Sequence, residues 1–134
     1  MKAIMTNREL MDHAIAMKKR AYVPYSNFPV GAALLTEDGS VITGCNVENA
    51  AYGVCICAEQ TAIVKAVSEG HRKFKAIAVS GNSEDYCLPC GACRQVMSEF
   101  APDDLPVLCA RADGEFASYT LGQLLAHAFR LEKK

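Results

Sequence analysis

Apolar and polar positions near the N-terminus follow a helical period. Apolar residues recur every three or four positions from Leu10 to Ala21. Thr6 and Glu9 precede them with the spacing of a capping box, and Pro24 interrupts the pattern. We therefore predict a first helix that begins after Thr6 and ends before Pro24.

The rest of the chain alternates short strands and helices. Two β-rich runs, 30–36 and 41–45, flank the turn residues 37–40 and predict an antiparallel hairpin. The pattern then predicts a helix from Ala58 to Gly70, strands at 75–80, 106–110 and 115–119, a helix at 90–100, and a final helix that starts with the capping-box spacing of Thr120 and Gln123 and runs through Phe129.

Strands separated by helices favour right-handed crossovers and a parallel stretch of sheet. We therefore expect an α/β fold, a three-layer α/β/α sandwich around a mixed five-stranded sheet. With 134 residues and an apolar share of 51%, the chain is predicted to form one domain over residues 1–134.

The charge balance narrows the possible partners. A net charge of −1, from 14 basic and 15 acidic residues, lacks the basic surface typical of nucleic-acid or acidic-membrane binding, so we expect a small-molecule partner. The apolar runs are far shorter than the ~20 residues that span a bilayer. No signal-peptide pattern stands at the N-terminus, and we expect a cytoplasmic protein.

Seven cysteines in a reducing compartment, an odd number, favour metal binding or catalysis over disulfides. Cys57 opens one predicted helix, and Cys90 and Cys93 share the first turn of another. Three thiolates suit Zn²⁺ and leave a fourth corner open, as in catalytic zinc sites. Spacing alone does not decide the set, because Cys55 and Cys87 lie close by; the helix start after Pro89 favours Cys90 and Cys93.

Glu59 follows Cys57 by two residues in the first turn of the same predicted helix. A carboxylate at this place can reach the open corner and move a proton between bound water and a substrate. Stabilisation of the helix dipole is the alternative role for an acidic residue in a first turn.

The motifs Cys57-Ala58-Glu59 and Pro89-Cys90-Gly91-Ala92-Cys93 match the zinc-deaminase signature in its all-cysteine form. The chain closely resembles the small, homotetrameric cytidine deaminases that act on free nucleosides. The resemblance extends through residues 24–34, 44–50, 57–59 and 89–95. It implies a cytidine deaminase-like fold, one Zn²⁺, and hydrolytic deamination of cytidine and 2′-deoxycytidine in pyrimidine salvage.

The resemblance also implies roles for individual residues. Cys57, Cys90 and Cys93 would bind zinc, and Glu59 would take a proton from zinc-bound water, protonate N3 of the pyrimidine and assist departure of ammonia from C4. The substrate-binding residues would be Phe28 against the pyrimidine, Asn46 and Glu48 at the ribose 3′-hydroxyl, Ala58, and Tyr52 and Phe129 at a site shared between subunits.

The sequence departs from the family pattern at two places. Gln60 stands where the family usually has an arginine that donates hydrogen bonds to the zinc thiolates. The family's Leu-Leu-Pro before the final phenylalanine is replaced by Leu124-Leu125-Ala126.

Other functions stay open at this point. A structural zinc module would use a fourth cysteine and leave Glu59 without a role, and a dithiol redox protein would use Cys90 and Cys93 alone. Among deaminases, a polynucleotide editor lacks support from an RNA-binding motif or a basic stripe. Blasticidin-type or other aminopyrimidine substrates are further alternatives, against which Asn46 with Glu48 favours a ribosyl group.

Overall fold

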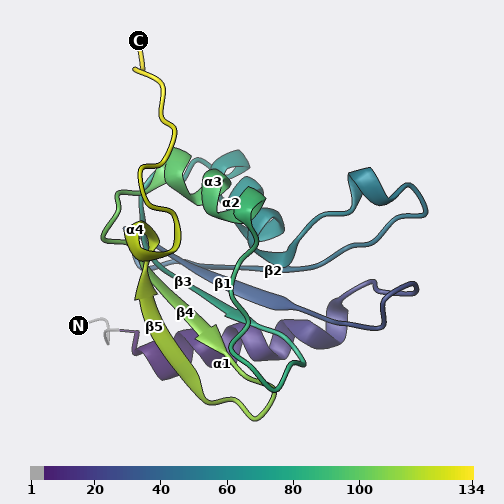
Figure 1. The fold of residues 1–134 in the computed structure, drawn as a ribbon. Helices are drawn as coiled ribbons and strands as arrows, with labels where there is room; N and C mark the ends of the chain where they lie inside the picture. Colours follow the sequence, from purple (N-terminus) through teal and green to yellow (C-terminus); the bar gives the residue numbers. More distant parts are fainter. Residues whose placement is uncertain (1–4) are drawn as a thin grey trace.

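The computed structural model describes residues 5–134, and within this range five strands form one mixed sheet (Figure 1). The strands are β1 (Gly31–Thr36), β2 (Val41–Cys45), β3 (Phe74–Ser80), β4 (Pro106–Ala110) and β5 (Phe116–Thr120). Their order across the sheet is β2-β1-β3-β4-β5. The β3–β4 pair is parallel and the other three pairs are antiparallel, which confirms the predicted hairpin and the mixed sheet.

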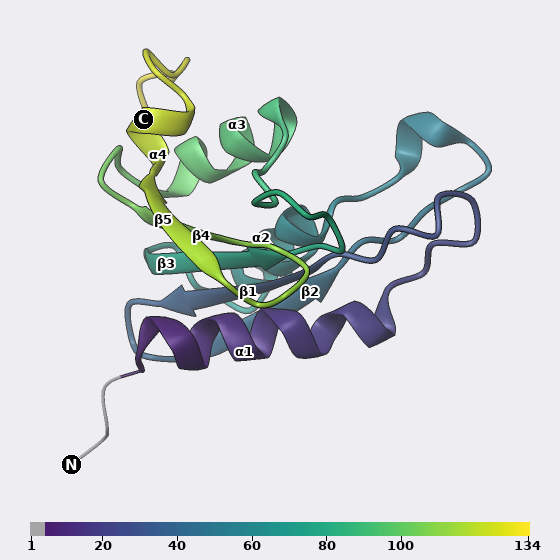
Figure 2. The ribbon, with the colours of Figure 1, turned by 60° about the horizontal axis from the view of Figure 1, so that its bottom comes forward.

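Helices cover both faces of the sheet, which confirms the three-layer sandwich. They are α1 (Asn7–Met17), α2 (Ala58–Ser68), α3 (Gly91–Phe100) and the short α4 (Leu121–Leu124), with single 3-10 turns η1 (Lys18–Arg20) and η2 (Tyr52–Val54). Figure 2 shows α1 on one face and α2 and α3 on the other. None of the helices within residues 5–134 has the length and apolar character needed to cross a bilayer.

Small residues bring α1 close to the sheet. Leu10, Met11 and Ala14 pack against sheet alanines in a core of their own, while α2 and α3 share the larger core on the opposite face. A Cβ at Gly31 would lie 2.0 Å from the Ala14 carbonyl oxygen. Glycine is therefore required at the start of β1.

The last predicted helix is wrong over most of its length. The capping box of Thr120 and Gln123 is present, but α4 ends at Leu124. His127 has a φ of 55°, outside the right-handed helical region. Arg94 and Gln95, both on α3, donate hydrogen bonds to the carbonyls of Leu124 and Phe129, so tertiary partners replace the helical amides.

Smaller boundaries also differ from the predictions. The Thr6 hydroxyl accepts a hydrogen bond from the Glu9 backbone amide, and the first helix turns into a 3-10 turn after Met17. The last strand runs from Phe116 to Thr120, one residue later than predicted.

Two segments extend away from the sheet and lie side by side (Figures 1 and 2). One is residues 46–57, which carries η2 and which we call the projecting arm; the other is residues 21–30. β-bridges join Val47 to Tyr22 and to Ile56. The projecting arm leads directly into α2, so its path determines where the first turn of that helix lies.

Candidate zinc centre and active site

The N-termini of α2 and α3 bring three cysteines together. Cys57 is the N-cap of α2, Cys90 is the N-cap of α3, and Cys93 lies in the first turn of α3. The Sγ atoms of Cys57 and Cys90 are 3.9 Å apart, those of Cys90 and Cys93 are 3.5 Å apart, and all three lie within 4.8 Å of one another. Tetrahedral Zn–S bonds of ~2.3 Å place thiolates about 3.8 Å apart, so these three thiols fit a Zn²⁺.

The described residues contain one such cluster, and it holds neither Cys55 nor Cys87. The Cys55 thiol instead accepts a hydrogen bond from the Asn49 amide on the projecting arm. A closed four-cysteine site is therefore absent from the described chain. A dithiol redox site formed by Cys90 and Cys93 alone does not account for Cys57, which lies in the same cluster.

The surroundings of the cluster favour ionisation of Cys57. Two helix N-termini place partial positive charge beside Cys57 and Cys90. Interaction with the neighbouring Cys93 thiol lowers the pKa of Cys57 to about 7, and the same interaction raises the pKa of Cys93. One thiol of the set is thus ready to ionise near neutral pH, as a metal ligand must.

Glu59 lies in the first turn of α2 with only 4% of its surface exposed. Burial raises the pKa of its carboxyl above the ordinary value. Its side chain lines a pocket of about 210 Å³ together with Cys57 and Cys90. A buried carboxyl beside a candidate metal site and a pocket has the position required of a general acid and base.

The pocket brings together several residues that the sequence predicts as substrate ligands. Its walls are formed by Phe28, Val30, Asn46, Cys57, Ala58, Glu59, Cys87, Leu88 and Cys90. The sequence analysis missed Val30, Cys87 and Leu88. Burial raises the pKa of Cys87 to about 11, so its thiol is neutral at physiological pH and forms an apolar wall.

The absence of a side chain at Gly81 allows two of these walls to approach each other. A Cβ at Gly81 would lie 3.0 Å from the Cys87 Sγ and 3.1 Å from two ring atoms of Phe28. Its missing side chain lets the aromatic ring and the thiol approach each other at the rim of the pocket. The run of polar residues around Gly81 gave no signal of this contact.

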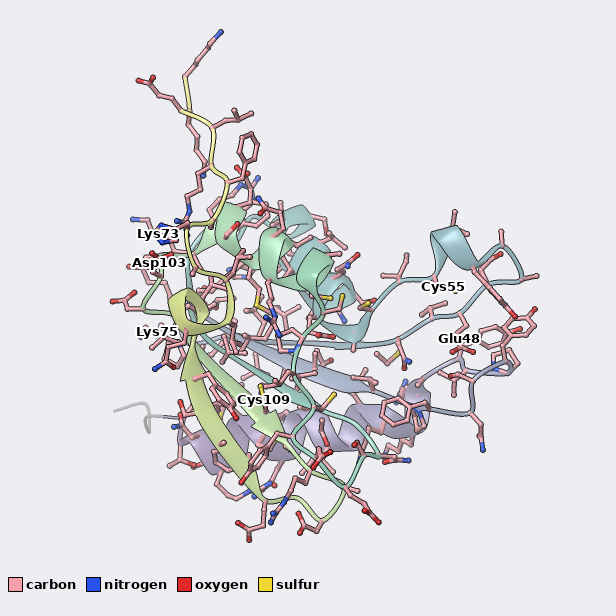
Figure 3. The ribbon with its side chains drawn as sticks, in the orientation of Figure 1. Glu48, Cys55, Lys73, Lys75, Asp103 and Cys109 are labelled. Atoms are coloured by element: carbon pink, nitrogen blue, oxygen red, sulfur yellow. The ribbon has the colours of Figure 1, made fainter. Side chains whose placement is uncertain are left out.

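The structure does not bring Glu48, Tyr52 and Phe129 into this pocket. Glu48 and Tyr52 line a second pocket of about 370 Å³, and Figure 3 shows Glu48 and Cys55 on the projecting arm. Phe129 lies on the C-terminal segment with 69% of its surface exposed. Within one subunit, these three predicted ligands are separate from Glu59.

Gln60 lies next to Glu59 and contacts the thiol cluster. Its Nε2 donates a hydrogen bond to Cys93 Sγ over 3.5 Å. An amide donor can orient a thiolate but brings no positive charge.

Comparison with known proteins agrees with this geometry. Residues 5–109 match the family model described as the cytidine and deoxycytidylate deaminase zinc-binding region. The chain is 48% identical over 128 residues to a cytidine deaminase of Sporosarcina psychrophila, covering 96% of this chain and 94% of that protein. It is 50% identical over 128 residues to the cytidine deaminase of Halalkalibacterium halodurans, covering 96% and 97%.

Solved structures give the same answer for the fold. The crystal structure of a cytidine deaminase from Burkholderia pseudomallei superposes with a TM-score of 0.90 at 50% sequence identity, covering 93% of this chain and all of that one. Sheet order, thiol cluster and sequence therefore agree, and the chain belongs to the cytidine and deoxycytidylate deaminase family.

Proposed function

We propose that this protein is a zinc-dependent hydrolase that converts cytidine and 2′-deoxycytidine to uridine and 2′-deoxyuridine with release of ammonia. The observation that carries the proposal is the buried Glu59 carboxyl in one pocket with the thiols of Cys57 and Cys90. The overall reaction consumes one water and breaks the C4–N bond of the pyrimidine. The names of the relatives support the substrate class.

Cys57, Cys90 and Cys93 would hold the metal. A zinc ion in such a site supplies a Lewis acid that makes water nucleophilic near neutral pH. Glu59 would accept the proton that water loses and deliver it to N3, which makes the ring carbon electron-poor as the new C–O bond forms. The same carboxylate would then take the proton of the new C4 hydroxyl and pass it to the amino group, so that the C4=O bond forms as the C4–N bond breaks and ammonia leaves. Its burial keeps bulk water from competing for this proton.

Phe28 and Asn46 would place the pyrimidine nucleoside. The ring of Phe28 would supply an aromatic wall, and Ala58 lines the same pocket beside Glu59. Asn46 accepts a hydrogen bond from the Val30 amide and donates one to the Phe28 carbonyl. Its second amide hydrogen is available for a sugar hydroxyl. We also assign Glu48 to the ribose. Its carboxylate would reach the sugar from the projecting arm.

We further propose a homotetramer with shared active sites. Large apolar side chains are exposed along the two projecting segments, among them Tyr22 at 56%, Tyr52 at 75% and Val54 at 58%. Several large apolar side chains exposed on two adjacent segments favour an interaction face. The pocket of about 210 Å³ is also smaller than the ~300–1,000 Å³ of ordinary ligand sites. Tyr52 and Phe129 would complete it from a neighbouring subunit.

The setting we propose is pyrimidine salvage in the cytoplasm by a single-domain chain over residues 1–134. All seven cysteines are free thiols, which suits a reducing compartment. The nearly balanced net charge favours a neutral nucleoside over polynucleotides or acidic membranes as the partner.

Steady-state kinetics on four substrates test the proposal. The kcat/KM for cytidine and 2′-deoxycytidine should exceed that for free cytosine by about 100-fold or more, because a site with unfilled polar sugar ligands is penalised. Cytidine monophosphate should be disfavoured, because the acidic Glu48 would repel its phosphate. Equal kcat/KM for cytosine and cytidine would contradict the proposal, and faster turnover of another aminopyrimidine nucleoside would reassign the substrate.

A further inference from the structure

The segment that carries Phe28 has no regular secondary structure. Residues 25–30 lie between η1 and β1, so backbone ladders do not fix the aromatic wall of the pocket. Side chains from the projecting arm take over this function. Asn46 Oδ1 accepts a hydrogen bond from the Val30 amide over 2.9 Å, and Asn46 Nδ2 donates to the Phe28 carbonyl over 3.0 Å. The C-terminal side of Phe28 is thereby attached to Asn46.

Ser26 makes the corresponding attachment on the N-terminal side. Its Oγ donates a hydrogen bond to Glu48 Oε2 and accepts one from the Phe28 amide over 3.1 Å. Glu48 Oε1 accepts from the backbone amides of Tyr25 and Ser26 over 3.0 and 3.1 Å. A single hydroxyl thus connects the Glu48 carboxylate to the backbone of Phe28.

The backbone between Ser26 and Phe28 is shaped for this contact. Asn27 adopts a left-handed conformation with a φ of 55°, which asparagine tolerates better than most residues. The Asn27 amide donates to the Val23 carbonyl over 3.0 Å. The turn that results directs the Phe28 amide back at the Ser26 hydroxyl, while the Phe28 ring packs close to Gly81.

Three hydrogen-bond donors contact the Glu48 carboxylate and leave one of its acceptor positions free. A carboxylate has about four acceptor positions, two on each oxygen. The two backbone amides fill those of Oε1, and the Ser26 hydroxyl fills one of the two on Oε2. The free position of Oε2 is therefore oriented by Ser26. Because the Ser26 hydroxyl stabilises the ionised form, the pKa of Glu48 is lowered and the group stays an acceptor.

We propose that Ser26 is a positioning residue that couples the sugar ligand Glu48 to the aromatic wall formed by Phe28. The inference rests on the proposed function, since it assigns a nucleoside to this pocket. Ser26 touches no reacting atom; it fixes the direction of the open Glu48 oxygen and the height of the Phe28 ring together. Its loss should weaken substrate binding and leave the chemistry at Glu59 largely intact.

Three variants test this coupling. Ser26→Ala removes both hydrogen bonds, Ser26→Thr keeps the hydroxyl, and Ser118→Ala is the matched control on an exposed position of β5. For cytidine, Ser26→Ala should raise KM about tenfold and change kcat less than about threefold, as expected for loss of a hydrogen bond to a charged group. Ser26→Thr should recover KM to within about threefold of the wild type. Zinc content should be unchanged in all three variants.

Amide hydrogen exchange supplies a readout independent of turnover. The Phe28 amide should exchange at least tenfold faster in Ser26→Ala than in the wild type, and Ser26→Thr should restore its protection. If Ser26→Ala does not fold, amide exchange in the wild-type protein still tests the proposal. Its Phe28 amide must then exchange about tenfold more slowly than the exposed turn amide of Asp113, and equal rates would overturn the proposal.

The two possible failures are distinguishable. A wild-type protein that deaminates cytidine while Ser26→Ala keeps the same KM, or while Ser26→Thr is no better than Ser26→Ala, overturns the role of Ser26 alone. A wild-type protein that holds zinc but does not act on cytidine overturns the proposed function. In that case unchanged Phe28 exchange in Ser26→Ala would overturn the Ser26–Phe28 connection as well, and faster exchange would support it.

Discussion

Gln60 donates a hydrogen bond from its side-chain amide to the Sγ of Cys93, one of the three clustered thiols. Three thiolates around a Zn²⁺ sum to a charge of −1, and two helix N-termini offset part of it. Gln60 adds a donor and no charge. The cluster therefore depends on helix dipoles and neutral donors for its stabilisation.

Gln60→Arg adds a positive charge at this contact. We expect a higher kcat, since a less negative cluster makes the metal more electrophilic. The acidic limb of the pH–rate profile should move to lower pH, because a positive charge favours the deprotonated form of groups nearby. The measurement is a pH series of kcat on both proteins with zinc content determined in parallel. Intact zinc with an unchanged or lower kcat and no shift of the limb would show that charge at this position does not limit the enzyme.

Glu59→Ala should separate metal binding from catalysis. The thiols hold the metal and the carboxyl moves protons, so the variant should keep about one zinc per chain while its deamination rate falls by a factor of ~10²–10⁴ or more. Metal analysis and initial rates on the same preparation check this. Stoichiometric loss of zinc would instead make Glu59 a ligand.

Gly44 controls how closely α2 approaches β2. A Cβ at Gly44 would lie 2.5 Å from the Ala58 carbonyl oxygen and 2.6 Å from the Ala62 amide nitrogen. Gly44→Ala should push the first turn of α2 away from the sheet and cost about 1–3 kcal/mol of unfolding free energy. Because Cys57 caps this turn and Glu59 lies in it, zinc retention and activity should fall with stability.

Gly53→Ala is the matched control for that substitution. Gly53 lies in η2, and a Cβ there would meet nothing within 4 Å. The unfolding free energy of the Gly53→Ala variant, measured in urea, should stay close to the wild-type value. Equal stability and equal zinc content of the Gly44 and Gly53 variants would contradict the proposed contact.

Local sequence patterns predicted the sheet, the first three helices and the thiol cluster. These features depend on period, on proline and on cysteines at helix starts, all of which act over a few residues. The predicted length of the final helix is wrong because tertiary contacts end this helix early. Its capping box is genuine, but Arg94 and Gln95 bind the later carbonyls and end the helix early.

The sequence analysis missed some residues of the site for the same reason. Cys87 and Leu88 looked like loop residues because only the fold brings them to Phe28 and Glu59. The sequence analysis assigns no role to Ser26, since its partner Glu48 lies 22 positions later in the chain. Side chains whose partners are distant in sequence are the ones that a pattern of neighbours does not predict.

Phe129→Ala tests whether active sites are shared. If Phe129 completes a neighbour's pocket, the variant should raise KM for cytidine several-fold while zinc content stays unchanged. Specific activity of the wild type should fall on dilution, in step with dissociation measured by sedimentation. A monomer with full activity at every concentration would refute the shared site.

Zinc stoichiometry measured together with the loss of cytidine absorbance on mixing tests the central claim most directly. The three-thiol cluster beside Glu59 predicts about one zinc per chain and conversion of cytidine to uridine with one ammonia released for each molecule consumed. Removal of zinc by a chelator should abolish the conversion, and added zinc should restore it. One tightly bound zinc per chain without any conversion of cytidine would contradict the account and indicate a structural metal site.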